Sequence, residues 1–175
     1  MTAPGAPSIH ASAVRVGDRA VLIRGPSGSG KSRLAFGLIV AGRAGQIPPV
    51  ELIGDDRVFL EQRDGRLRVR PVPGLAGMIE VRGLGLRRVP AAPEAVVGLV
   101  VDLAAEDAAR LPEAAALRMM LEGVELPRVP VGPGYDPLPL VVAALTTGDA
   151  IAPGTQLDDC RKDFGNHMSH TIVTE

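Results

Sequence analysis

Residues 25–32 of the chain read Gly25-Pro26-Ser27-Gly28-Ser29-Gly30-Lys31-Ser32, a glycine and four further residues before Gly-Lys-Ser. This spacing is the Walker A pattern, in which backbone N–H groups of a glycine-rich loop turn toward a phosphate. The helix that follows adds the partial positive charge of its first turn. Lys31 is expected to reach the terminal phosphates, and the Ser32 hydroxyl to bind Mg²⁺. The loop therefore predicts a site for a nucleotide or a polyphosphate.

The residues on either side of the loop argue against a chance glycine-rich turn, because they supply the strand and the helix that a phosphate loop requires. Residues 9–16 and 20–24 read as two strands joined by a turn at Gly17-Asp18. Residues 31–41 carry apolar side chains at helical spacing, and Gly42 is placed to end that helix. The predicted unit is a hairpin, a loop and a helix.

Farther along the chain, apolar runs and turn residues predict a mixed sheet. Strands are expected at residues 50–53, 57–62, 67–72 and 96–101. The alanine-rich residues 106–121 are expected to be partly helical despite Pro112, and a last helix is expected around residues 140–145. The predicted fold class is α/β, with a mixed sheet that carries the phosphate loop and with flanking helices.

The length of 175 residues suits one domain, which is expected over residues 1–152. The polar, aperiodic residues 153–175 are expected to form a mobile tail. No apolar run approaches the roughly 18 to 20 residues of a membrane-spanning helix. The first residues lack the features of a secretory signal, so we expect the protein in the cytoplasm, away from the membrane.

Charge and composition argue against a protein whose main task is to bind nucleic acid. The formal net charge is −1, whereas binding of a phosphate backbone requires clustered positive charge. Aromatic residues make up only 2% of the chain, so stacking platforms for single-stranded nucleic acid are scarce. We therefore expect no nucleic-acid partner.

Two adjacent carboxylates, Asp55 and Asp56, follow a predicted strand at a position from which they can face the phosphate loop. One is expected to hold Mg²⁺ or water, and the other to accept a proton from the phosphoryl acceptor. The alternative is a simple turn, which Gly-Asp-Asp also favours. Asp102, after another predicted strand, is a second candidate for a metal-linked carboxylate or a cap of the strand end.

Residues 77–85 place Glu80 and Arg82 two positions apart, among glycines that allow a ligand to approach closely. Glu80 could bind a metal and Arg82 could bind a phosphate. By residue type alone, an ion pair on the surface of a strand is the better interpretation. A lone histidine such as His10 is, by itself, more often structural than catalytic.

The order of these pieces is more specific than any one of them. His10, the Walker A loop, Asp55-Asp56-Arg57-Val58 and the segment Ile79-Glu80-Val81-Arg82-Gly83-Leu84-Gly85 follow one another along the chain. This order resembles the catalytic domain of HPr kinase/phosphorylase, the bacterial enzyme that phosphorylates a serine of the phosphocarrier protein HPr and also removes that phosphate. The resemblance runs from about His10 to residues 130–134.

The resemblance implies a role for each matching residue. Lys31 contacts the phosphates, Ser32 and Glu80 bind Mg²⁺, and Asp56 accepts the proton of the serine. His10 matches the active-site histidine, Arg82 neutralises developing charge, and Arg110 is the candidate for a further catalytic arginine. ATP or pyrophosphate is the implied phosphate donor. The alternatives are a small-molecule P-loop kinase and a non-catalytic module that senses nucleotides.

The resemblance also implies properties of the whole molecule. The expected fold is similar to the nucleotide domain of phosphoenolpyruvate carboxykinases, and the expected assembly is a hexamer. The chain resembles the short form found in alphaproteobacteria, which lacks a regulatory N-terminal domain. Arg33 stands where a glutamate is usual, and Tyr135-Asp136 stands where an arginine and a neutral polar residue are usual. The second departure predicts weak phosphorylase activity.

Overall fold

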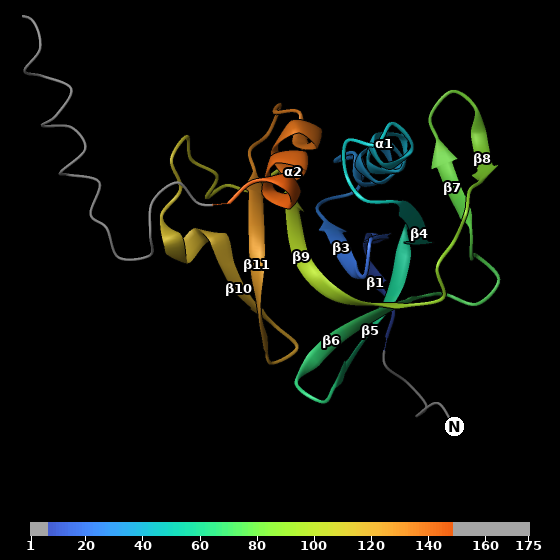
Figure 1. Cartoon of the computed structure of the whole chain (residues 1–175), viewed down its shortest axis with the longest axis horizontal. Coiled ribbons are helices and arrows are strands. Elements are labelled where there is room, and N and C mark those ends of the chain that lie inside the picture. Colours follow the sequence, from blue (N-terminus) through green and yellow to red (C-terminus); the bar gives the residue numbers. More distant parts are fainter. Residues whose placement is uncertain (1–6, 149–175) are drawn as a thin grey trace, which may run out of the picture.

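A computed structural model describes residues 7–148, which form a mixed sheet with two helices on one face (Figure 1). The sheet has nine strands, in the order β1-β5-β6-β9-β3-β2-β4, with β11 beside β9 and β10 beside β11. Its strands are β1 (Ile9–His10), β2 (Ser12–Val16), β3 (Arg19–Arg24), β4 (Val50–Gly54), β5 (Arg57–Arg63), β6 (Arg66–Pro71), β9 (Ala95–Leu103), β10 (Arg118–Leu121) and β11 (Val124–Val131). The predicted α/β class is confirmed.

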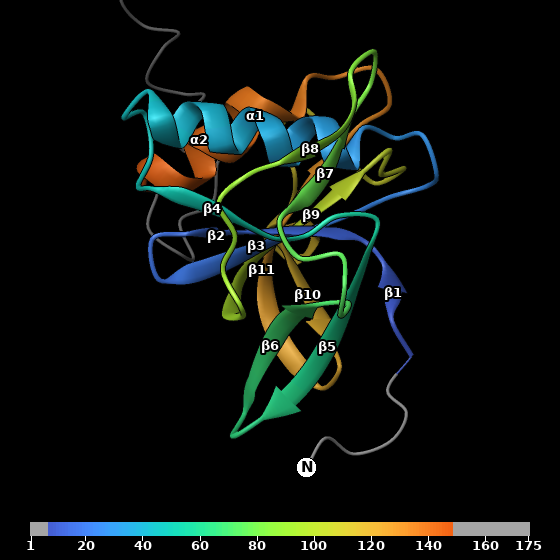
Figure 2. The same cartoon turned by 90° about the vertical axis from the view of Figure 1, so that its right-hand side faces the viewer.

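The remaining elements lie around this sheet. They are the helices α1 (Lys31–Arg43) and α2 (Pro137–Thr146), the 3₁₀ turn η1 (Ala114–Leu117), and the separate hairpin of β7 (Met78–Val81) and β8 (Gly85–Arg88). The two helices lie side by side over the sheet, and the β7–β8 hairpin stands beside α1 (Figures 1 and 2). Within residues 7–148, neither helix is long and apolar enough to cross a membrane.

Strand β3 runs through the middle of the sheet and leads directly into the phosphate loop. It pairs in parallel with β9, which in turn pairs in parallel with β11. The carboxyl ends of these three strands therefore meet at one edge of the sheet, where open α/β sheets bind their ligands. Strand β4 reaches the same edge, since both β3 and β4 pair antiparallel with β2.

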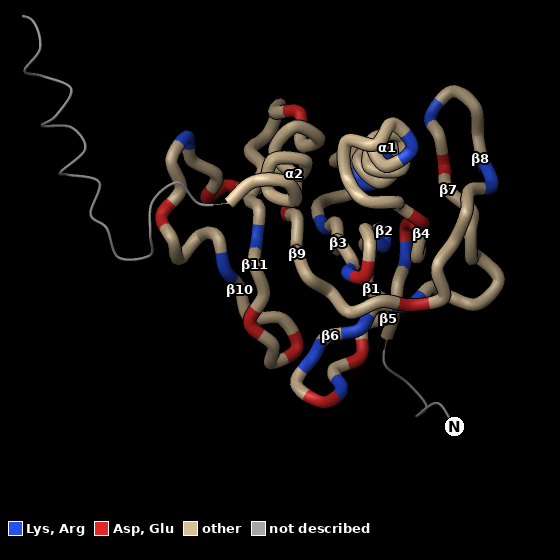
Figure 3. Tube along the Cα trace, viewed as in Figure 1, with Lys and Arg blue, Asp and Glu red and all other residues tan. Residues whose placement is uncertain are grey.

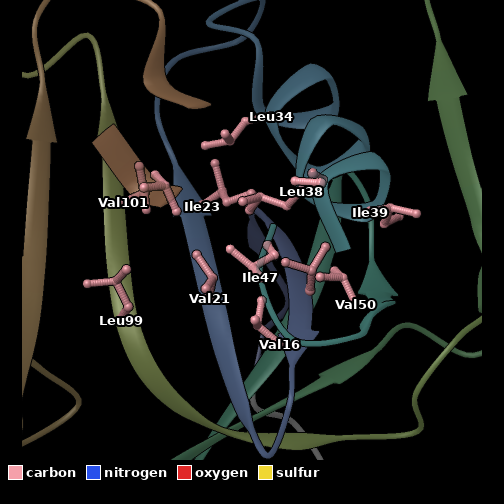
Figure 4. Packing of buried hydrophobic residues seen from close by; sticks show 14 of the residues in the cluster. Val16, Val21, Ile23, Leu34, Leu38, Ile39, Ile47, Val50, Leu99 and Val101 are labelled. Atoms are coloured by element: carbon pink, nitrogen blue, oxygen red, sulfur yellow. The ribbon is translucent and has the colours of Figure 1, made fainter. Parts of the chain in front are cut away.

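Alternation along β3 divides the core into two layers. Val21 and Ile23 face α1 and pack with Leu34 and Leu38 (Figure 4). The intervening residues Ala20 and Leu22 face the other way, toward the β5–β6 hairpin, where they pack with Val58, Leu60, Leu67 and Val69. Successive side chains of a strand point to opposite faces, so one strand joins both layers.

The predicted elements near the phosphate loop are confirmed, with two corrections. The strand predicted at residues 9–16 is split into β1 and β2 at Ala11, whose N–H donates to Asp56 O at 3.1 Å. Gly42 does not end α1, which continues to Arg43. A Cβ atom on Gly42 would lie 2.7 Å from Val50 Cγ2, so this glycine lets the helix lie close to β4.

The prediction of a helix within residues 106–121 is wrong for most of that stretch. The structure has only the short η1 turn there, followed by the strand β10. Strand β10 pairs with β11, which was not predicted from the sequence because Pro127 and Pro130 weaken its strand pattern. The alanines at 114–116 form only the η1 turn, and the four residues after it pair with β11 instead of extending a helix. The predicted last helix is confirmed as α2, and the predicted tail lies outside the described residues.

Candidate active site

The phosphate loop joins β3 to α1, and its first glycine is required by close packing. A Cβ atom on Gly25 would lie 2.6 Å from Ser29 Oγ and 3.0 Å from both Leu103 Cβ and Leu103 O. A larger residue at this position would push the loop away from the end of β9. The helix begins at Lys31, with Gly30 as its N-cap, so the positive end of α1 lies directly behind the loop.

Lys31 is held inside the loop, with only 6% of its surface exposed. Its Nζ donates to Gly25 O and to Pro26 O, both at 3.0 Å. Burial lowers the pKa of Lys31, although the nearby carboxylates of Asp56 and Asp55 oppose this shift. The loop thus places one cation where a phosphate chain would lie.

Asp55 connects three segments of the site through its carboxylate. Oδ1 accepts hydrogen bonds from Ser12 Oγ at 2.6 Å and from Ser32 Oγ at 2.8 Å, and Oδ2 accepts from the Glu80 N–H at 3.1 Å. Asp55 is buried, and these three hydrogen bonds replace those that its carboxylate would form with water in an exposed position. The carboxylate therefore fixes the Ser32 hydroxyl and the strand that carries Glu80.

Asp56 lies next to Asp55 but points into an open space, with 71% of its side chain exposed. Its φ is 66°, and the Arg57 N–H donates to Asp55 O at 2.8 Å, so Asp56 is the centre of a tight turn. His10 Nε2 lies 3.1 Å from Asp56 Oδ1. The turn interpretation and the placement of a carboxylate near the loop are therefore both correct.

A cavity of about 630 Å³ brings most of the predicted site residues together. It is lined by residues 27–32 of the loop and by His10, Asp56, Glu80 and Arg82, with Arg33, Phe36 and Val81. Glu80 is on β7 and Arg82 is in the turn that follows. The ion pairs within residues 7–148 do not include a Glu80–Arg82 pair, and both side chains line the cavity instead.

Two predicted residues are placed elsewhere. Arg110 is exposed in the segment after β9 and does not line the cavity. Asp102 forms ion pairs with Arg24 at 2.8 Å and with Arg128 at 2.6 Å. Its carboxylate is thus already engaged by two arginines, whereas Asp55 is bonded to the loop serine. The sequence indicated Asp55 only as one of two adjacent carboxylates. The signal for its contact with the loop was its position directly after β4.

The oxygen atoms at the loop suit Mg²⁺ as a companion of a bound phosphate. The Ser32 hydroxyl and the carboxylates of Asp55, Asp56 and Glu80 supply hard oxygen donors. Residues 7–148 contain no cluster of three or more His, Cys, Asp or Glu side chains arranged around a metal position. Mg²⁺ commonly binds through one or two protein groups together with substrate phosphates, and these residues fit that mode.

Comparisons with known proteins point to one family. The family model described as "HPr Serine kinase C-terminal domain" matches residues 4–146. The chain is 31% identical over 140 residues to the HPr kinase/phosphorylase of Geobacillus thermodenitrificans, a match that covers 73% of this chain and 43% of that protein. It is 36% identical over 77 residues to the HPr kinase/phosphorylase of Mycoplasma mycoides, covering 44% and 22% of the two chains. These matches span less than half the length of the relatives.

The fold is also similar to that of a solved protein, the HPr(Ser) kinase/phosphatase from Coxiella burnetii. The TM-score is 0.63 at 22% sequence identity, and the match covers 91% of this chain and 99% of that one. At this level of identity, the likeness concerns the fold.

Proposed function

The chain belongs to the family of the HPr serine kinase C-terminal domain, and from this membership we propose that it transfers a phosphoryl group from ATP to a serine of an HPr-type phosphocarrier protein. The observation that carries the proposal is the single cavity that joins a Walker A loop to the His10–Asp56 pair. A Walker A loop alone would indicate only that the chain binds a phosphate compound. An exposed carboxylate beside the reacting phosphate supports transfer.

On the acceptor side, Asp56 takes the proton of the attacking serine hydroxyl. Its carboxylate is exposed and can be reached by a side chain of another protein. His10, 3.1 Å away, orients this carboxylate. Proton transfer to a positioned carboxylate prepares the serine oxygen to form its bond with phosphorus as the bond to the donor's leaving phosphate breaks.

On the donor side, the loop binds the phosphate chain through its backbone N–H groups and the start of α1. Lys31 and Arg82, which line the same cavity, neutralise the charge that builds up during transfer. Ser32 and Glu80 would hold Mg²⁺, which, when bound, withdraws charge from the phosphate oxygens. Asp55 keeps the Ser32 hydroxyl in place.

The test is a transfer assay with purified chain, Mg²⁺, ATP labelled on its terminal phosphate, and an HPr-type phosphocarrier. We expect label on the carrier and none on a carrier variant whose acceptor serine is replaced by alanine. Label that appears only on a small molecule would favour a small-molecule P-loop kinase. Tight binding of ATP without any transfer would favour a nucleotide-sensing module.

Three further properties belong to this proposal and rest on family membership. The same site would remove the phosphate from the serine in the presence of inorganic phosphate, more slowly than it adds it, and pyrophosphate would serve as a second donor. The protein would work in the cytoplasm as a homo-oligomer, with a hexamer as the expected form, and without nucleic acid as a partner. The expected likeness to the nucleotide domain of phosphoenolpyruvate carboxykinases stays a prediction.

A further inference from the structure

A second cavity, of about 280 Å³, lies on the other side of the phosphate loop. It shares Gly28 and Ser29 with the larger cavity, so the two cavities lie next to each other along the loop. Its other walls come from Leu103 and Ala104 at the end of β9, from Val131 at the end of β11, from residues 132–135 that follow, and from Pro137 at the start of α2. The cavity therefore lies beyond the carboxyl ends of three parallel strands.

The two cavities differ in chemistry. The larger one holds Lys31, Asp56, Glu80 and Arg82, whereas the residues that line the smaller one are uncharged and mostly apolar or glycine. Figure 3 shows the same contrast, since α2 and the end of β11 are drawn largely without charge. A phosphate chain bound along the loop would thus have its reacting end in the charged cavity. Whatever is attached to its other end would enter the uncharged one.

Tyr135 is the aromatic residue of the smaller cavity, and 74% of it is exposed. Its ring lies beside the bare backbone of Gly132, where a Cβ atom would be 3.4 Å from ring atom Cδ2. The Tyr135 N–H donates to Gly132 O at 3.3 Å, and Asp136 caps α2 by accepting from the Leu138 N–H at 3.2 Å. The turn and the helix cap fix the backbone around Tyr135, and the ring keeps an open face.

We propose that the smaller cavity binds the nucleoside of the phosphate donor, with the base stacked on Tyr135. The proposal rests on the proposed function, since it assigns the nucleoside end of the same donor. Stacking accepts any base, because every base has a π face. The chain therefore binds a nucleoside diphosphate more tightly than pyrophosphate, which carries the same two phosphates without the nucleoside.

The test is calorimetric titration of the whole chain, in the presence of Mg²⁺, with ADP and with pyrophosphate. The difference between the two affinities measures how much the nucleoside contributes to binding. We expect Tyr135→Ala to weaken ADP binding by about 10-fold and to leave pyrophosphate binding unchanged. Tyr135→Phe, which keeps the ring, should bind both compounds as the wild type does.

Each other outcome overturns the proposal in a recognisable way. Equal affinity of the wild type for ADP and pyrophosphate would show that the nucleoside makes no contact. Unchanged ADP binding by Tyr135→Ala would show that the base lies elsewhere. An equal loss of affinity for ADP and for pyrophosphate would show that the ring only supports the loop. In these three cases the proposed function stands. Binding of neither compound by the wild type would overturn the proposed function as well.

Discussion

Asp55 and Asp56 are neighbours in the chain whose side chains face opposite environments. Asp55 is buried and accepts three hydrogen bonds from β2, α1 and β7. Asp56 is exposed in a turn with a φ of 66° and meets His10. Asp56 occupies a left-handed turn between β4 and β5, and such uncommon backbone conformations gather at functional sites. In the proposed mechanism, Asp55 is therefore the structural member of the pair and Asp56 the reactive one.

Asp56→Asn should lower phosphoryl transfer by roughly 10² to 10⁴-fold while ATP binding stays nearly unchanged. Asparagine tolerates the left-handed backbone, so the turn is kept and only the basic oxygen is lost. Transfer rates and ATP titration would be measured side by side. Asp64→Asn is a matched control, because Asp64 also has a positive φ of 53° but lies in the exposed β5–β6 turn. High residual transfer together with collapsed ATP binding would make Asp56 a metal or structural residue.

Tyr135→Arg should increase phosphate-dependent dephosphorylation of the carrier more than it changes forward transfer. The reverse reaction needs inorganic phosphate on the loop, and residues 28–29 of the loop also border the smaller cavity that Tyr135 lines. A guanidinium at position 135 would bind this phosphate through two parallel hydrogen bonds, and its flat face would still stack on a base in forward transfer. Tyr135 offers no charge, and Arg128 is already paired with Asp102 and Asp107. Both rates would be measured with millimolar phosphate. Wild-type dephosphorylation as fast as its kinase reaction would contradict the prediction.

Some site residues could be found from the sequence and others could not. The Walker A loop is contiguous, so its spacing alone predicted the positions of Lys31 and Ser32. The role of Asp55 depends on Ser12, Ser32 and Glu80 meeting at one carboxylate, although they come from three distant segments. No local pattern carries that information.

At the level of elements, an ion-pair cluster joins β3, β9 and β11. Asp102 of β9 accepts from Arg24 Nε at 2.8 Å and from Arg128 Nε at 2.6 Å, and Arg128 is also paired with Asp107. Arg24 directly precedes Gly25 of the phosphate loop. Burial opposes ionisation of Asp102, but the hydrogen bonds from the two arginines outweigh it and hold the pKa of this carboxyl below its usual range. The cluster thus anchors the strand from which the loop starts.

Asp102→Asn should reduce the free energy of unfolding by about 2 kcal/mol near neutral pH, because it removes the charge that two arginines share. A carboxyl with a lowered pKa stabilises the fold above its unfolded-state pKa of about 4, and this contribution is lost as the pH falls through the folded-state value. The gap between variant and wild type should therefore shrink in acid. Urea unfolding at pH 7 and near pH 3 would measure it.

Asp107→Asn is the control for this prediction, since Asp107 pairs with Arg128 from an exposed position. It should cost much less stability at neutral pH, because exposed ion pairs contribute little. A gap between Asp102→Asn and the wild type that is equal at both pH values would mean that packing, and not charge, accounts for the loss.

The elements that the sequence predicted are those with a local signal. Helix α1 has apolar residues at helical spacing, and the β5–β6 hairpin has Asp64-Gly65 at its turn. Strand β11 lacks such a signal, since two prolines interrupt it and one of its partners, β9, is distant in the chain. Strand β10 is joined to β11 by the short turn at Glu122 and Gly123, but it follows the alanine-rich stretch that favoured a helix. The place of β11 in the sheet is decided by the free edge of β9, which only the assembled sheet provides.

In the whole molecule, β3 connects both layers of the core to the phosphate loop. Its alternate side chains pack under α1 and against the β5–β6 hairpin. The loop follows its last residue, and the first glycine of the loop packs on Leu103 of β9. Binding at the loop is therefore coupled to the stability of the entire sheet, and the described domain should unfold as one unit.

This coupling predicts that ADP with Mg²⁺ raises the melting temperature of the wild type. A ligand that binds only the folded state, at 100 times its dissociation constant, adds about 2.7 kcal/mol of stability. For a domain of this size, that corresponds to a shift of about 5–10 °C. Lys31→Ala removes the one lysine held inside the loop, so the same ADP concentration should leave its melting temperature almost unchanged. Scanning calorimetry of both proteins, with and without ADP at constant ionic strength, measures the two shifts. An equal shift in wild type and variant would place the nucleotide outside the loop, because the loss of its buried cation must weaken any phosphate chain bound there.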